Sequence, residues 1–252
     1  MLPFAMAICQ SLAGPADAVA AAAPWRIDIN IAQSELTEDL PAWRETLLAV
    51  GRGFNDGWAA TARLEASERF DRNDLYGEVR VDRALGEASS AYLTLGLGPG
   101  AEFRPEAAFR FGGAAWVAGS HDARTTLQID LDWARYSRAG EIQTLKVGVE
   151  RWFADGRASL NGRWIGLLDD AREKRTGFSI GGSWRTHDRL DLRFIYADAP
   201  ESDQGLTVDV RTLALGATLE VSDAFSLRAW VTSEERVAYD RSELSLGAAW
   251  RL

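Results

Sequence analysis

The chain has 252 residues, of which 46% are hydrophobic, and its formal net charge is −9. This composition excludes a disordered chain and favours one compact folded unit. The acidic charge argues against nucleic acid as a partner, because binding to phosphates requires a basic surface. After the N-terminus, no apolar run approaches the roughly 18 to 20 residues of a membrane helix, so only strands could cross a membrane.

The first 23 residues are apolar and rich in small side chains, and the sequence changes abruptly at Pro24-Trp25. Ala16-Asp17-Ala18 and Ala18-Val19-Ala20 both fit the small-x-small cleavage rule. We therefore predict a cleaved signal peptide over residues 1–23 and a single domain over residues 24–252. The only cysteine, Cys9, lies in the signal peptide, so the mature chain is expected to lack disulfides and thiolate metal sites.

From Trp25 to the end, apolar residues fall on every second position, which predicts strands and no helix. Residues 241–252, RSELSLGAAWRL, keep this alternation to the last residue. The second and twelfth segments lose phase internally, which indicates a bulge or a wrong assignment there. We expect about fourteen strands, with twelve or sixteen as alternatives, near residues 25–34, 42–52, 58–69, 75–85, 90–98, 106–116, 124–136, 142–153, 158–168, 176–186, 189–197, 207–221, 225–235 and 241–252.

The connections alternate in character along the chain. One set carries turn signals, such as Asn55-Asp56-Gly57 and Gly86-Glu87. The other set is mostly longer and highly charged, as in residues 35–41 (ELTEDLP) and 169–175 (DDAREKR). Tight turns at one end and polar loops at the other are typical of an outer-membrane barrel.

Strand length and tryptophan position favour a bilayer over a soluble core. Most predicted strands run about 9 to 13 residues, near the length of a tilted membrane strand and above the average of about 5 to 6 in soluble proteins. Indole prefers the membrane interface, whereas a tryptophan that fills a soluble core is expected in mid-strand, as only Trp164 and Trp230 are. The predicted interface girdle comprises Trp25, Trp43, Trp58, Trp116, Trp133, Trp152, Trp184 and Trp250.

The opposite face of the strands carries charges of both signs, which require hydration or pairing. A barrel of about fourteen strands has a backbone radius of roughly 14 Å, wide enough for a polar lumen. An open pore and a lumen plugged by an Arg–carboxylate lattice fit the sequence equally well. The predicted lumen-facing residues are Arg63, Glu65, Arg69, Glu78, Arg80, Asp82, Arg110, Asp130, Asp132, Lys146, Glu150, Arg163, Arg185, Arg193, Arg211 and Arg228.

No catalytic constellation is evident in the sequence. The two histidines, His121 and His187, fall in predicted turns, and a carboxylate metal site at Asp169 and Asp170 is less favoured than a solvated loop. The string GLGPG at residues 96–100 lacks the helix and the Lys-Ser/Thr of a phosphate loop. We therefore predict no enzyme activity, no cofactor and no metal.

The sequence resembles the YaiO family of outer-membrane β-barrel proteins. The resemblance lies in GWAATARLEASERFDRNDLY, with Trp58, Arg69-Phe70 and Tyr76, and in AYLTLGLGPGAEFRPEAAFRFG, with Tyr92 and Phe103-Arg104-Pro105. Less specifically, it extends through VGVERWFADGRASLNGRW to the C-terminal strand. Family members have Phe-Pro where this chain has Phe103-Arg104-Pro105. The resemblance implies a signal peptide, an outer-membrane barrel and a part in exopolysaccharide production or export.

The sequence thus predicts a closed antiparallel up-and-down transmembrane β-barrel in the outer membrane of a Gram-negative bacterium. Its last strand is expected to pair with the first, which removes the free sheet edges. The favoured function is passage or export of a polar solute or exopolysaccharide through the lumen. A plugged structural or surface-interaction barrel and a lipid-modifying barrel enzyme are the alternatives. Expected partners are outer-membrane lipid, lipopolysaccharide, the barrel-assembly machinery through the C-terminal strand, and polysaccharide.

Overall fold

The computed structural model describes residues 25–252 except 121–122, 138–139 and 204–205. The predicted signal peptide, Cys9 and His121 therefore lie outside the described residues. The described residues form one three-residue 3-10 turn, Asn55–Gly57. No helix among them is long and apolar enough to span a membrane.

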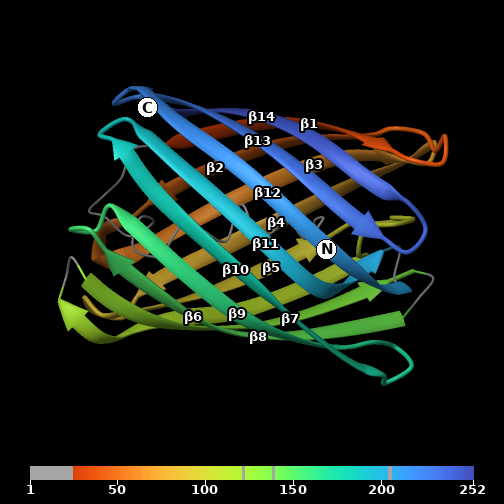
Figure 1. Cartoon of the computed structure of the whole chain (residues 1–252), viewed down its shortest axis with the longest axis horizontal. Coiled ribbons are helices and arrows are strands. Elements are labelled where there is room, and N and C mark those ends of the chain that lie inside the picture. Colours follow the sequence, from red (N-terminus) through yellow and green to blue (C-terminus); the bar gives the residue numbers. More distant parts are fainter. Residues whose placement is uncertain (1–24, 121–122, 138–139, 204–205) are drawn as a thin grey trace.

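The predicted strands form one closed antiparallel barrel (Figure 1). Each strand pairs with its neighbours in sequence, and β1 pairs with β14. The strands are β1 Arg26–Leu36, β2 Trp43–Gly53, β3 Trp58–Arg69, β4 Arg72–Ala84, β5 Ser89–Leu97, β6 Ala107–Ser120, β7 Ala123–Tyr136, β8 Gly140–Phe153, β9 Ala158–Leu168, β10 Lys174–His187, β11 Leu190–Asp203, β12 Leu206–Ser222, β13 Phe225–Arg236 and β14 Asp240–Arg251.

The pairing of β1 with β14 closes the barrel. The register runs without a break from Arg26 opposite Arg251 to Leu36 opposite Arg241. The backbone N–H of Leu252 also donates to the carbonyl of Trp25 at 2.8 Å. The prediction that the terminal strands are hydrogen-bonded neighbours is confirmed, and the alternation up to the last residue has its reason in this ladder.

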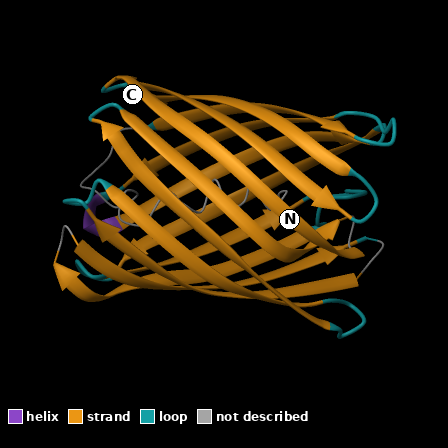
Figure 2. Cartoon of the chain, in the orientation of Figure 1, coloured by secondary structure: helices purple, strands orange, loops and turns teal. Residues whose placement is uncertain are grey.

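The two ends of the barrel differ, as the loops in Figure 2 show. We call the end with the short connections the turn end; it includes residues 54–57, 85–88, 154–157, 188–189 and 223–224. We call the other the loop end; it includes residues 37–42, 70–71, 98–106, 169–173 and 237–239.

Strand alternation separates an apolar outer face from a polar interior. On β14, Leu244 and Leu246 are 53% and 48% exposed, whereas Glu243 and Ser245 are 6% exposed. On β1, Ile31 faces outward and is 54% exposed, whereas its neighbour Ala32 is 7% exposed. A surface of this kind, apolar outside and polar inside, inverts the arrangement of a soluble domain and suits contact with lipid.

One of the two expected irregularities is a bulge. The pairing of β12 with β13 shifts between Glu220 and Ser222, next to the turn end. In contrast, β2 keeps an unbroken register with both β1 and β3. Its apparent loss of phase arises because Leu47, which faces the interior, is followed by the outward-facing Leu48.

Candidate functional site

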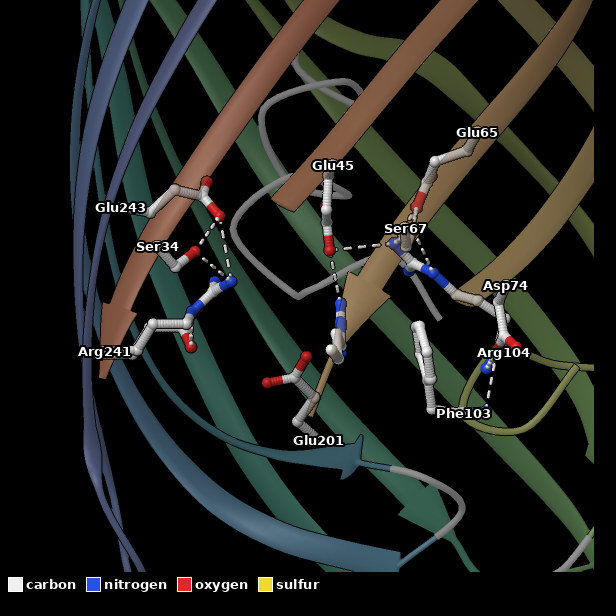
Figure 3. Close-up of polar contacts among 12 residues, drawn as sticks. Ser34, Glu45, Glu65, Ser67, Asp74, Phe103, Arg104, Glu201, Arg241 and Glu243 are labelled. Atoms are coloured by element: carbon white, nitrogen blue, oxygen red, sulfur yellow. Dashed lines mark hydrogen bonds and ion pairs between the residues drawn. The ribbon is translucent and has the colours of Figure 1, made fainter. Parts of the chain in front are cut away.

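A cluster of paired charges lies on the interior face at the loop end (Figure 3). Its members come from β1, β2, β3, β11, β13, β14 and the β5–β6 connection, and each is nearly inaccessible to solvent. We call this set the loop-end cluster: Ser34, Trp43, Glu45, Glu65, Ser67, Arg69, Arg104, Glu201, Glu234, Arg236, Arg241 and Glu243.

The β5–β6 connection, residues 98–106, folds inward and is anchored by Asp74 of β4. The Asp74 carboxylate accepts three consecutive backbone N–H groups, from Glu102 at 2.8 Å, Phe103 at 2.9 Å and Arg104 at 2.7 Å. Successive N–H groups converging on one carboxylate form an anion nest, and hydrogen bonds to a charged acceptor are the stronger kind. Gly98 is required here, since a Cβ would lie 2.7 Å from the carbonyl oxygen of Pro105.

This anchorage places Arg104 in the interior, where it is 1% exposed. Its Nη2 donates to Ser67 at 2.9 Å and to Glu45 Oε1 at 3.1 Å, and it also contacts Glu65. Arg69 Nη2 donates to the same Glu45 oxygen at 2.7 Å. A loop residue is therefore the cation between two strand carboxylates.

The opposite half of the cluster is built on β13 and β14. Arg241 holds Glu234 in a two-point contact, with Nη2 to Oε1 at 2.6 Å and Nε to Oε2 at 2.9 Å. Its Nη1 donates to Glu243 at 3.0 Å. Arg236 Nη2 bridges Glu234 at 2.7 Å and Glu201 of β11 at 2.8 Å. Charges buried this deeply are tolerated because each is paired and hydrogen-bonded.

Trp43 joins the two halves. The guanidinium carbons of Arg69, Arg241 and Arg236 lie 4.3, 5.1 and 5.7 Å from the centre of its ring, within the range of cation–π attraction. Phe70 and Tyr239 pack edge-on against the same ring, at 5.5 and 5.9 Å between centroids. The contacts run along the interior of the wall from β11 through β13, β14 and β2 to β3, which are close to one another in the strand order of the barrel.

Below the cluster, toward the turn end, the interior is still charged but more open. Arg110 donates to Asp132 at 2.6 Å, Lys146 donates to the same carboxylate at 2.8 Å, and Arg63 donates to Glu78 at 3.1 Å. The side chains of Arg80 and Arg110 are 26% and 24% exposed, against 0% for Arg241. A cavity of about 30 Å³, enough for one water molecule, is lined by both Arg104 and Arg110. Solvent therefore reaches the interior below the cluster.

The predicted lumen-facing residues lie on the interior face, with one exception. Arg211 faces outward at the loop end, where its Nη1 donates to Glu235 at 2.8 Å. It shares its face with Leu213 and Leu215, which are 51% and 57% exposed. The prediction is wrong for Arg211 because β12 carries apolar residues on both faces, which hid its phase in the sequence.

The predicted girdle is only partly on the outer face. Trp25, Trp58, Trp184 and Trp250 face outward at the turn end, with 48%, 46%, 60% and 38% exposure, and Trp133 faces outward nearer the loop end. Contact of these five with the membrane interface stays a prediction.

Three residues of the predicted girdle lie on the interior face. Trp43 is fully buried in the loop-end cluster, on the same face as Glu45. Trp116 pairs with Thr126 and Trp152 with Ser159, so that alternation places both on the interior register near the turn end. The prediction is wrong for these three because distance from a strand end does not reveal which face a side chain occupies.

The remaining candidate residues, Asp169, Asp170 and His187, lie in connections or at a strand end. Asp169 accepts the backbone N–H of Glu173 at 2.8 Å, and Asp170 accepts that of Glu141 at 3.3 Å, so both stabilise loop-end backbone. His187 is exposed at the turn end of β10. Across the described ranges, no three His, Cys, Asp or Glu side chains are grouped in a way that could hold a metal ion.

Comparison with known proteins supports the fold. No family model matches the sequence, and no curated protein matches it. Among solved structures, the chain is similar to the CymD monoaromatic hydrocarbon channel, with a TM-score of 0.63 at 10% identity over 96% of this chain and 92% of that one. The fold is that of an outer-membrane β-barrel.

Two further solved structures agree with this assignment. The Ralstonia pickettii toluene transporter TbuX has a TM-score of 0.61 at 9% identity, over 96% of this chain and 92% of that one. A bacterial polysaccharide outer membrane secretin has a TM-score of 0.59 at 10% identity, over 91% and 98%. The barrel thus resembles those of an outer-membrane channel, a transporter and a secretin, and the identities are low enough that the likeness concerns the fold alone.

Proposed function

We propose that the protein passes a polar solute or an exopolysaccharide across the outer membrane of a Gram-negative bacterium and that the loop-end cluster gates this passage. The observation that carries the proposal is the charged, solvent-reached interior below the cluster, where Arg80 and Arg110 are about a quarter exposed. Charged groups remain ionised in such a lumen because water hydrates them. A lumen of this kind favours polar solutes, because they can replace the hydrogen bonds that water makes with the charged side chains.

The charged interior weighs against an apolar solute. Hydrocarbon in contact with Arg80, Arg110 or Lys146 would strip water from them without replacing its hydrogen bonds. CymD and TbuX are described as a hydrocarbon channel and a toluene transporter, and we assign neither substrate to this chain. The resemblance of the sequence to the YaiO family supports a polar cargo, including an exopolysaccharide.

The buried loop-end cluster favours a second candidate, a permanently plugged structural barrel. Replacing a buried ion-pair network by apolar side chains is often neutral or stabilising, so a plug needs no charges for stability alone. A gate, however, must be able to rearrange. The loop-end cluster can do so together with residues 98–106, because several of its charged groups have more than one hydrogen-bond partner. Conduction distinguishes a gate from a plug.

Purified protein in planar lipid bilayers is expected to give discrete current steps, brief in the wild type because the cluster closes the loop end. Heat-unfolded protein at the same concentration is the control for leakage at the bilayer. A flat baseline for both the wild type and the variant Asp74→Ala, which removes the anchor of residues 98–106, would rule out passage and leave the plugged barrel.

A further inference from the structure

Five arginines gather on the interior face at the turn end, on neighbouring strands from β10 through β14 to β1. We call them the basic patch: Arg26, Arg185, Arg193, Arg228 and Arg251. Among the described residues, the carboxylates seen paired with them are Asp28, Asp191 and Glu220. The patch therefore carries more positive than negative charge, in a chain whose net charge is −9.

The sheet register places two of these cations directly opposite each other. Arg26 of β1 pairs with Arg251 of β14 on the same face, and like charges in this position repel. The positive charge of Arg251 is only weakly compensated by its partners. Its Nη2 lies 4.0 Å from Glu220, and its Nη1 donates to the carbonyl of Asp223 at 3.3 Å. An anion between the two guanidinium groups would remove the repulsion.

Arg228 supplies a donor that points into the same region. Its side chain crosses β14 and donates through Nη2 to Asp28 of β1 at 2.5 Å. The Nε of Arg228 lies beside Gly247, where a Cβ would be in ordinary contact with it at 3.6 Å. That Nε is buried and has no hydrogen-bond partner among the described residues, and the positive charges of Arg26 and Arg193 also act on Arg228. A buried guanidinium N–H without an acceptor is costly. The side chain of Arg228 as a whole is 29% exposed, so an anion in the lumen can reach other N–H groups of its guanidinium.

We propose that the basic patch binds anionic groups, namely carboxylate, sulfate or phosphate, and makes the lumen prefer anionic solutes. This inference deepens the proposed passage function by naming the class of solute. Guanidinium suits the role, since its planar fork matches the geometry of these oxyanions. Charge of one sign concentrated at a channel mouth raises the local concentration of the opposite ion.

The preference for anions over cations is measured from the reversal potential of open channels under a KCl gradient. The wild type is expected to favour chloride over potassium by about twofold or more. Arg228→Gln/Arg251→Gln is expected to bring the ratio to one or below. In this variant Asp28 keeps Arg26 as its partner, and Glu220, which loses Arg251, is 43% exposed.

The matched control is Arg44→Gln/Arg211→Gln, which removes the same charge from the outer face, where these side chains are 67% and 54% exposed.

Binding is measured separately, so that it does not depend on conduction. Citrate added to the detergent-solubilised wild type and to the outer-face control is expected to raise the unfolding midpoint by about 2 °C or more, because a ligand of the folded state stabilises it. Arg228→Gln/Arg251→Gln is expected to lose this shift. Equal citrate shifts in all three proteins, or a potassium preference in the wild type, would overturn the anion site. Citrate binding without any current would retain the site and refute passage.

Discussion

Replacing Asp74 by Ala is expected to increase the fraction of time that the channel is open by about tenfold or more. The substitution removes the acceptor of three backbone N–H groups in residues 98–106. Each hydrogen bond to a charged group contributes about 1.5–3 kcal/mol, so the loss of even one shifts an open–closed equilibrium by about an order of magnitude. Single-channel recordings in planar bilayers measure the open fraction directly.

The matched control for Asp74→Ala is Asp169→Ala. Asp169 also anchors a loop-end connection, through the backbone N–H of Glu173, but that loop is exposed and contributes nothing to the loop-end cluster. It should leave the open fraction near that of the wild type. If both variants behaved alike, the closure would not depend on how residues 98–106 are held.

Replacing Arg241 by Ala is expected to lower the free energy of unfolding by about 3–5 kcal/mol, because the change leaves buried carboxylates without their cation. Glu234, with 0% side-chain exposure, loses a two-point partner, and Glu243 loses its contact at 3.0 Å. Urea titration of the protein folded into lipid vesicles, followed by tryptophan fluorescence, gives the free energy from the midpoint and slope.

Arg211→Ala is the control for this measurement. Arg211 also pairs with a glutamate at 2.8 Å, but the side chains of Arg211 and Glu235 are 54% and 64% exposed. Exposed pairs contribute about 0–1 kcal/mol, so a small change is expected. Similar losses for the two variants would mean that the loop-end cluster is hydrated and does not close the barrel.

Periodicity predicts the barrel because the side-chain period of a strand is two and lipid requires one uniformly apolar face. The same argument assigns Arg63 and Asp132 to the interior, where they lie. It fails at Arg211 because β12 carries apolar residues on both faces. The girdle prediction fails at Trp43, Trp116 and Trp152, since a position near a strand end does not indicate which face of the strand a side chain occupies.

The loop-end cluster was not predicted as a unit because it depends on how residues 98–106 fold. The sequence places Arg104 in a charged connection, and only the anchorage at Asp74 brings it between Glu45 and Glu65. Part of the signal was present. Glu234-x-Arg236 and Arg241-x-Glu243 carry opposite charges two residues apart, hence on one face, on both sides of one loop.

The most direct measurement of gating is the current through the variant Ala101→Cys/Ser137→Cys/Asp74→Ala, recorded before and after reduction. Ser137 Oγ donates to the carbonyl of Ala101 at 3.0 Å, so the two residues are adjacent. A disulfide between cysteines at these positions, verified by the loss of free thiols, would tether residues 98–106 in the closed position. The only native cysteine, Cys9, lies in the predicted signal peptide. The oxidised channel should stay closed and, after dithiothreitol, open as Asp74→Ala does. Equal currents in both states would contradict closure of the lumen by this loop.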